Sequence, residues 1–375
     1  MFSPIHRIYE FRKSPVLSFD RQNSNPYRVV CNEENGSQTA YCFSAPMYES
    51  KSKKALDMKF RKNGEEIHFA GSGADVTFAD AVTMKNKQGF CRLSLPQRAR
   101  FLSDQELLCG DGRIFGTTNG IAYKIPLTGE QSDSVFLEVD KPFMEVRTNN
   151  HCFALMREQF RPFVTVTCIG TVGTSGDVIA PAKVTYQKQN DRTYELSFKT
   201  GSPMGKWVLF EVNLYEPKLF QDTTVESNHP KMNNAFGSVC FLGQTKECGE
   251  QWLYTRPDFS KIKELYDKRI LKAVLHIPKL NKEFIGATAY KLPSRFCSFG
   301  STWQNKIAAM SAAAVATADA DFMHLDLTNL LTDKHKRLSA TEGFILKPQH
   351  PLKGFCVIST GDSYYAPQIL EINFK

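Results

Sequence analysis

The chain of 375 residues carries 47 basic and 39 acidic residues, a formal net charge of +8, and 42% hydrophobic residues. This composition supports a buried core, allows two or three domains, and excludes a chain that is disordered throughout. The positive charge is mild for the length and is densest in two short runs, 49–64 and 333–338. Solvated faces are therefore favoured over a nucleic-acid interface.

The first residues, "MFSPIHRIYEFRKSPVLSF", lack the continuous apolar core and the small-residue cleavage site of a signal peptide. No apolar run approaches the roughly 20 residues that a membrane helix needs, so no membrane span is expected. A mature form, retention after synthesis in the cytosol, and export by a non-classical route all remain open. Residues 1–26 are predicted to form an irregular lead-in.

Short segments with alternating apolar and polar residues dominate the chain, with Gly, Asn, Asp or Pro in almost every gap. The first two, "ALDMKF" and "EEIHFAG", predict a hairpin with Asn63-Gly64 at its tip. The glycine-rich segment 110–120 lacks the lysine of a phosphate-binding loop and predicts a further hairpin loop. The expected fold is all-β: two antiparallel β-sandwich, jelly-roll-like domains, with helix below about 15% of residues.

The domain boundary is predicted at Tyr215–Phe220, where a proline follows the longest apolar strand. Residues 27–217 would form an N-terminal β-rich domain, and residues 218–375 a second sandwich. Within the second, "DFSKIKELYDKR" predicts a short helix or turn with Ser260 as N-cap. The alanine-rich segment 302–321 is compatible with a helix or with a loop that crosses the sheet.

Two strands of the second domain show clear face patterns. In "RILKAVLHI", alternation predicts one core face that contains Leu271, Ala273, Leu275 and Ile277. In "QILEINF", it predicts Leu370, Ile372 and Phe374 inside and Glu371 and Asn373 outside. This closing strand is expected to be held in a sheet by partners from early in the same domain.

From about residue 219 to residue 375, short motifs follow one another in a specific order. Their positions are Asp222, Thr223, Val225, Asn234, Gly237, Leu242, Gly243, Phe259, Ala273, Leu275, Ile277, Thr302, Trp303, Asn305, Asp326, Thr328, Gly343, Phe344, Leu346, Pro367, Leu370 and Ile372. In this order the motifs resemble those of the DNRLRE (disaggregatase-related) β-sandwich family. The chain departs from the family pattern at Ile307, where a proline is usual, and at Thr341-Glu342, which replaces Asn-Tyr.

The resemblance implies a carbohydrate-binding-module-like domain at a cell surface or outside the cell. The first half is similar to the β-rich segments that precede such modules in bacterial surface proteins. A non-enzymatic structural or adhesive protein of a bacterial surface, coat or extracellular assembly is therefore expected, with other protein chains or polysaccharide as partners. Two alternatives stay open: a protein that recognises an acidic polysaccharide, and an enzyme that acts on polysaccharide through the first domain.

The remaining residue types offer little catalytic chemistry. The ten cysteines form no C-x-x-C pair, and many lie in apolar segments, so buried reduced thiols are favoured over disulfides. His276 and His324 are expected on strand faces turned away from the core, as hydrogen-bonded surface histidines. The acidic pairs Asp319/Asp321 and Asp326/Asp333 favour solvated turns, with a structural calcium ion left open. No other cofactor is expected.

Aromatic residues near predicted loops and strand ends are the best candidates for ligand binding, because sugar rings stack on such side chains. Basic residues nearby would attract an acidic chain. For Tyr364 and Tyr365, adjacent in an extended segment, at most one can stack on a ligand while the other packs. The candidate binding residues are Tyr364, Tyr365, Trp303, Trp252, Tyr290, Lys347 and Lys353.

Overall fold

The computed structural model describes residues 18–47, 58–70, 73–147, 151–157, 161–308, 311–339 and 341–375. Residues 1–17 of the predicted lead-in and most of the basic run 49–64 lie outside this description. Strands hold 56% of the residues and helices 4%, which confirms the all-β prediction. The described chain divides into two compact units, residues 58–216 and residues 18–47 with 217–375, here called unit 1 and unit 2.

Unit 1 consists of two antiparallel sheets that are joined where β12 (Gly120–Thr128) pairs with β13 (Gln131–Ser132), so that the strands close into a barrel around one shared core. Phe198 and Phe210, one from each sheet, stack with ring centroids 3.9 Å apart. Gly116 of one sheet faces the Phe69 ring of the other so closely that a Cβ atom would collide with it. These contacts fix the two sheets face to face, as in a sandwich.

The first sheet of unit 1 has the strand order β4 (Phe60–Asn63), β5 (Glu66–Ala70), β6 (Asp75–Phe78), β7 (Ala81–Asn86), β8 (Gly89–Ser94), β14 (Val135–Val139), β20 (Thr193–Thr200) and β19 (Ala182–Asn190), with β13 (Gln131–Ser132) also on β20. The second has the order β9 (Arg100–Phe101), β10 (Glu106–Cys109), β11 (Gly112–Gly116), β12 (Gly120–Thr128), β21 (Trp207–Leu214), β17 (Arg161–Val172), β16 (Cys152–Arg157) and β15 (Met144–Arg147), with β18 (Val178–Ala180) also on β17.

The predicted hairpins of unit 1 are present. Asn63 pairs with Glu66, so Gly64 and Glu65 form the tip, one residue later than predicted. Gly64 has φ +63°, a conformation that glycine adopts without strain. Within the glycine-rich segment, Cys109 pairs with Gly112, which confirms a hairpin loop.

Unit 2 is a sandwich of two antiparallel sheets, here called the β25 sheet and the β24 sheet. The β25 sheet has the order β1 (Ser18–Asn25), β2 (Arg28–Asn32), β3 (Gln38–Phe43), β32 (Ile369–Phe374), β25 (Ile270–Pro278), β29 (Phe322–Asp326) and β28 (Thr317–Ala318). The β24 sheet has the order β27 (Ala312–Val315), β26 (Ala287–Lys291), β30 (Phe344–Pro348), β24 (Gly249–Pro257), β23 (Val239–Thr245) and β31 (Phe355–Ser359), with β22 (Phe220–Glu226) on β24.

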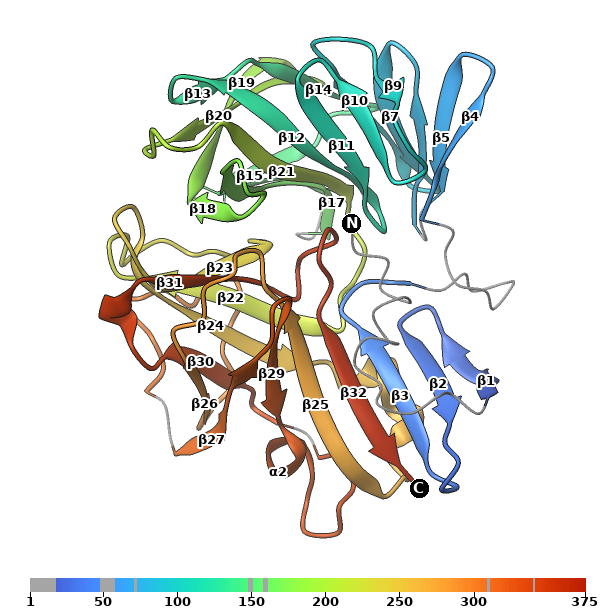
Figure 1. Cartoon of the computed structure of the whole chain (residues 1–375), viewed down its shortest axis with the longest axis vertical. Coiled ribbons are helices and arrows are strands. Elements are labelled where there is room, and N and C mark those ends of the chain that lie inside the picture. The colour runs from blue at the N-terminus through green and yellow to red at the C-terminus, as the bar shows by residue number, and fades with distance from the viewer. Residues whose placement is uncertain are drawn as a thin grey trace. The chain divides into compact units, whose positions relative to one another are not determined.

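The closing strand is held in a sheet: β32 lies between β25 and β3, with Leu370, Ile372 and Phe374 in the core as predicted (Figure 1). The division at Glu216/Pro217 falls inside the predicted boundary. Residues 27–47, however, were expected in the N-terminal domain, and residues 18–25 in an irregular lead-in. They form β1–β3 of unit 2, because β3 hydrogen-bonds to β32, a pairing across more than 300 positions that no local pattern reveals.

The core face predicted for β25 is wrong at Leu271, the first residue assigned to that face. A bulge lies between the pairs Ile270–Phe374 and Lys272–Asn373. Ile270 therefore enters the core, whereas Leu271 is 41% exposed. Ala273, Leu275 and Ile277 are core residues, as predicted.

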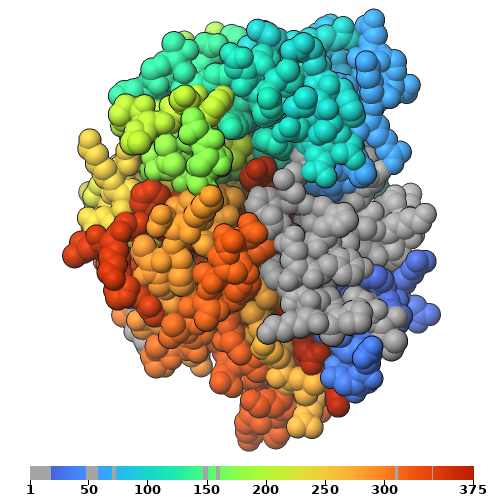
Figure 2. Space-filling model, in the orientation of Figure 1, coloured from blue at the N-terminus to red at the C-terminus, as the bar shows by residue number. Residues whose placement is uncertain are grey.

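In the part of the chain that the structure describes, the helical segments are few and short: η2 (Phe259–Leu265), α2 (Thr328–Leu331) and η3 (Pro351–Lys353). The N-cap of η2 is Asp258, not Ser260; the Asp258 carboxylate accepts the Ser260 N–H. The described part of the alanine-rich segment forms a loop followed by β27 and β28 rather than a helix. In the space-filling view, the orange segments of unit 2 form a continuous stretch of surface (Figure 2).

Candidate functional site

The outer face of the β24 sheet brings together four of the predicted binding residues. In β24, Leu253 points into the core, so its neighbour Trp252 points outward. The register in which Leu253 pairs with Leu346 of β30 places the next residue along each strand, Trp252 and Lys347, side by side. Tyr290 of β26 lies on the same face, opposite Ile345. Three adjacent strands thus place two aromatic rings and an ammonium group beside one another.

The loop after β26 adds the fourth residue, Trp303. Its ring lies 4.5 Å from the Trp252 ring at an interplanar angle of 47°. The Thr302-Trp303-Gln304-Asn305 segment is a tight turn, because Asn305 Oδ1 accepts hydrogen bonds from the Thr302 N–H at 2.7 Å and from its hydroxyl at 3.0 Å. The Tyr254 hydroxyl donates to the Ile307 carbonyl at 3.2 Å and fastens the end of this turn to the sheet.

Two lysines cover the rings of this group. The Nζ atom of Lys347 lies 4.0 Å from the centroid of the Trp252 ring, and that of Lys306 lies 4.2 Å from the Trp303 ring. Partial burial lowers the pKa of Lys347, against the attraction of Glu250. Glu250 also accepts the Trp252 indole N–H at 2.7 Å, which fixes the orientation of the ring. Trp252, Tyr290, Trp303, Lys306 and Lys347 are called the aromatic–lysine cluster.

The other predicted binding residues lie elsewhere in unit 2. Tyr364, in the loop between β31 and β32, is only 2% exposed and packs under Lys218, so it is not accessible for stacking on an external ligand. Tyr365 is half-buried in the same loop. Lys353 is in η3, beside β31, on the far side of β24 and β23 from Lys347. Tyr364 is therefore the tyrosine that packs, whereas a binding role for Tyr365 stays a prediction.

A hydrogen-bonded chain crosses the outer face of the β25 sheet. His276 Nδ1 and His324 Nδ1 are 2.7 Å apart. His276 Nε2 lies 3.1 Å from Glu371 Oε2, and His324 Nε2 lies 2.9 Å from Asp319 Oδ2. Burial lowers the pKa of His276. Both histidines point away from the core as predicted, but His276 is buried rather than on the surface. Sequence analysis missed the chain because its members are neighbours across strands.

The acidic pairs act within turns. Asp319 Oδ1 accepts the N–H groups of Asp321 and Phe322, and Asp333 Oδ1 accepts those of His335 and Arg337. At Asp319, partial burial opposes the shift, but the hydrogen bond with His324 and the two backbone N–H groups lower the pKa; at Asp333, the N–H groups of Arg337 and His335 lower it. The turn prediction accounts for these carboxylates; a structural calcium ion stays a prediction.

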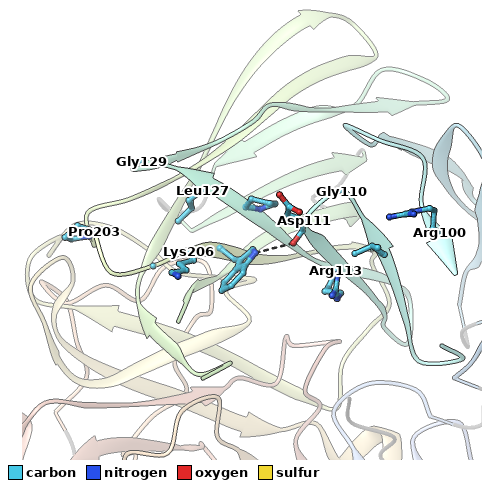
Figure 3. A pocket seen from close by; sticks show the side chains of 12 residues that line it. Arg100, Gly110, Asp111, Arg113, Leu127, Gly129, Pro203 and Lys206 are labelled. Carbon is cyan, nitrogen blue, oxygen red and sulfur yellow. Dashed lines mark hydrogen bonds between the residues drawn. The ribbon is translucent and has the colours of Figure 1, made fainter. Parts of the chain in front are cut away.

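Unit 1 has a basic hollow around its tryptophan (Figure 3). The Trp207 indole N–H donates to the Asp111 carbonyl at 3.3 Å, and Lys124 Nζ lies 4.1 Å from the ring centroid. Arg113 and Lys206 also line the hollow. Here one aromatic ring is present, whereas the aromatic–lysine cluster of unit 2 has three.

Comparisons with known proteins found no matching family model and no matching curated protein. The DNRLRE resemblance therefore stays a prediction. Within the described ranges, no helix has the length and apolar character needed to cross a membrane.

Proposed function

We propose that the protein is a non-catalytic, adhesive β-sandwich protein that binds an acidic polysaccharide through the aromatic–lysine cluster. The observation that carries this proposal is the convergence of three aromatic side chains and two lysines on one outer sheet face. Stacking alone would suit any sugar, and lysines alone any anion. Together they suit a polymer whose pyranose rings carry carboxylates.

Binding would exchange one partner of each lysine for another. In the free protein, the ammonium groups of Lys347 and Lys306 lie over the indole rings of Trp252 and Trp303. A uronate carboxylate is a stronger partner than a ring face, because a charge-assisted hydrogen bond adds to the Coulomb attraction. As each lysine turns to a carboxylate, it uncovers an indole face on which the C–H side of a sugar ring can stack.

This exchange predicts selectivity for acidic over neutral polymers. A neutral glycan would have to displace the lysines without replacing their electrostatic partner. Salt should weaken the binding, because the Debye length falls from about 10 Å at 0.1 M to about 3 Å at 1 M ionic strength. A position at a bacterial surface or in an extracellular assembly forms part of the same proposal and rests on the family resemblance.

The test is electrophoretic retention in gels that contain alginate, polygalacturonate or a neutral glucan, at low and high salt. Retention is expected only in the two acidic gels and should diminish with salt. Trp252→Ala should weaken binding by roughly 5- to 150-fold, the equivalent of about 1–3 kcal/mol for one stacked ring. Trp207→Ala is the matched control, because Trp207 also lies under a lysine but belongs to unit 1.

Two outcomes contradict the proposal. If the acidic gels do not retain the wild-type protein at low salt, the protein does not bind these polysaccharides. If the Trp252→Ala variant is retained as strongly as the wild type, the binding site does not include the aromatic–lysine cluster. Polymer length, measured as reducing ends after incubation, separates a binding protein from an enzyme. Shortening of the polymer would favour the enzymatic alternative.

A further inference from the structure

A row of outward-facing cations crosses the second sheet of unit 1, beside the basic hollow. Arg100 of β9 pairs with Leu108 of β10, and Leu108 pairs in turn with Arg113 of β11. Arg113 then pairs with Lys124 of β12. These residues point outward, because their neighbours in the same strands, such as Ile114, belong to the core. Adjacent strands lie about 4.8 Å apart, so the three cations, here called the cation row, share roughly 14 Å of the sheet.

The charges of the cation row repel one another. Arg113 and Lys124 are directly opposed like charges, an arrangement that destabilises an antiparallel pair of strands. Among the described residues, no carboxylate forms an ion pair with a member of the row. Partial burial lowers the pKa of Lys124; Arg113 adds to this shift, and Glu106 opposes it. An anion from outside the chain would relieve the repulsion when it binds.

The adjoining hollow has the size of a small-molecule site. Its volume is about 730 Å³, within the usual range for such sites. Arg100, Arg113 and Lys206 line it from three separate segments of the chain (Figure 3). The Lys206 backbone is held on both sides, because its N–H donates to the Val172 carbonyl at 3.2 Å and its carbonyl accepts the Leu127 N–H at 2.9 Å. The basic side chains are thus carried by a fixed backbone around the hollow.

Trp207 of β21 supplies an aromatic ring to the hollow. It pairs with Pro126 of β12, two positions along from Lys124, so both side chains share the outer face of the sheet. Lys124 Nζ lies 4.1 Å from the ring centroid. The indole N–H donates to the Asp111 backbone carbonyl at 3.3 Å, which fixes the orientation of the ring. Asp111 is the acidic residue among those that line the hollow, against three basic ones, so the net charge there is positive.

We propose that the hollow binds a nucleoside phosphate, with the phosphate between Arg113 and Lys124 and the base on the indole face of Trp207. A phosphate dianion compensates two adjacent cations, whereas one carboxylate compensates only one of them. The guanidinium group of Arg113 matches two phosphate oxygens at once. A nucleobase stacks on an aromatic side chain through its π-face, which all bases share. Opposed cations beside a single flat ring therefore favour a nucleotide over a sugar acid.

Binding would move Lys124 from the ring to the phosphate. A charge-assisted hydrogen bond to phosphate is stronger than the contact of an ammonium group with a ring face, and the movement uncovers the indole for the base. Arg100 lies two strands from Arg113, about 10 Å by strand spacing, so its guanidinium group is placed for a second phosphate. A nucleoside diphosphate should therefore bind more tightly than the monophosphate.

This site is distinct from the aromatic–lysine cluster of unit 2. All residues that line the hollow belong to unit 1, and two of them are arginines, which the cluster lacks. None of its basic residues lies in the runs 49–64 and 333–338, so the charge density of the sequence does not mark it. Nucleotide binding and retention by acidic polysaccharide should therefore respond to different variants.

Isothermal titration calorimetry of the full-length protein with AMP, ADP, adenosine and inorganic phosphate tests the proposal. ADP should bind more tightly than AMP, and AMP more tightly than adenosine or phosphate alone, by at least about 10-fold in each case. Trp207→Ala should weaken AMP binding by roughly 5- to 150-fold. Trp252→Ala is the matched control, because Trp252 also lies under a lysine but belongs to unit 2.

Arg113→Gln tests the phosphate contact. This variant should bind AMP at least about 10-fold less tightly, because a hydrogen-bonded charge is lost. Since it also removes one of two directly opposed like charges, the urea midpoint of unit 1 should rise. Arg92→Gln is the matched control: Arg92 is also a strand residue of unit 1, but it lies 3.7 Å from the Glu138 carboxylate, so its loss should leave AMP binding unchanged.

Several results would overturn the proposal. If the wild-type protein binds neither AMP nor ADP at millimolar concentration, the hollow is not a nucleotide site. If inorganic phosphate binds as tightly as AMP, the base is not recognised; if adenosine does, the phosphate is not. A lower urea midpoint of Arg113→Gln would show that Arg113 stabilises the free protein, contrary to the repulsion in the cation row. A single-stranded deoxyadenosine tetranucleotide distinguishes the sources of the ligand: tighter binding than ADP assigns the site to a strand, and weaker binding assigns it to a free nucleotide.

Discussion

Replacement of Ile270 by alanine should destabilise unit 2 far more than the same replacement at Leu271. The two residues are adjacent, but the bulge in β25 buries Ile270 to 1% exposure and leaves Leu271 41% exposed. Truncation of a fully buried isoleucine to alanine costs about 2–5 kcal/mol, through lost burial and the cavity that remains. Truncation of the exposed leucine should cost less than about 1 kcal/mol.

Urea unfolding followed by tryptophan fluorescence measures this difference. Unit 2 holds Trp252 and Trp303, so a Trp207→Phe background removes the signal of unit 1. With a denaturant slope of about 2 kcal/mol per molar urea, a loss of 3 kcal/mol lowers the midpoint by roughly 1.5 M. The Leu271→Ala midpoint should stay within about 0.5 M of the parent protein. An equal or larger loss at Leu271 would show that β25 has the unbulged register that simple alternation predicts.

Three further predictions concern titration, thiols and salt. Because burial lowers the pKa of His276, unfolded chains bind more protons than folded ones just below pH 6.5. The free energy of unfolding of unit 2 should therefore fall as the pH is lowered from about 7 to about 5. If this pH dependence is unchanged in His276→Gln, other groups cause it. Without reductant, an alkylating reagent should label native protein at Cys297, which is exposed, and denatured protein at all 10 cysteines. If the other nine cysteines of the denatured protein are labelled only after reduction, they form disulfides. Lys347→Met should bind acidic polysaccharide less tightly and with a weaker dependence on salt, whereas an unchanged salt dependence would exclude Lys347 from the binding site.

The fold class could be predicted from the sequence because alternation is a local signal. In β32, the residues from Leu370 to Phe374 take the faces that their parity predicts, because the bulge in the pairing with β25 inserts its extra residue into β25 and leaves β32 regular. At Leu271 the same reasoning fails, because a single inserted residue reverses the face and nothing in the local sequence marks it. The pairing of β3 with β32 was also beyond local patterns, since it depends on which distant strands meet.

The candidate site was predictable in residue type but not in arrangement. Trp252, Tyr290, Trp303 and Lys347 were singled out as exposed aromatic and basic residues, and they do converge. Tyr364 had the same signal and is buried, because its loop folds inward over β22 instead of passing along the edge. Lys306 was missed, since a lysine in a polar loop has no distinctive pattern.

The pairing of β3 with β32 has a consequence for the order in which the chain folds during synthesis. All of unit 1 is translated between these two strands, and its strands pair only with one another. Unit 1 can therefore reach its final structure on the ribosome while β1–β3 still present an open strand edge. That edge is closed only when residues 369–374 emerge, so during this interval the early strands are exposed to pairing with other chains and to chaperones.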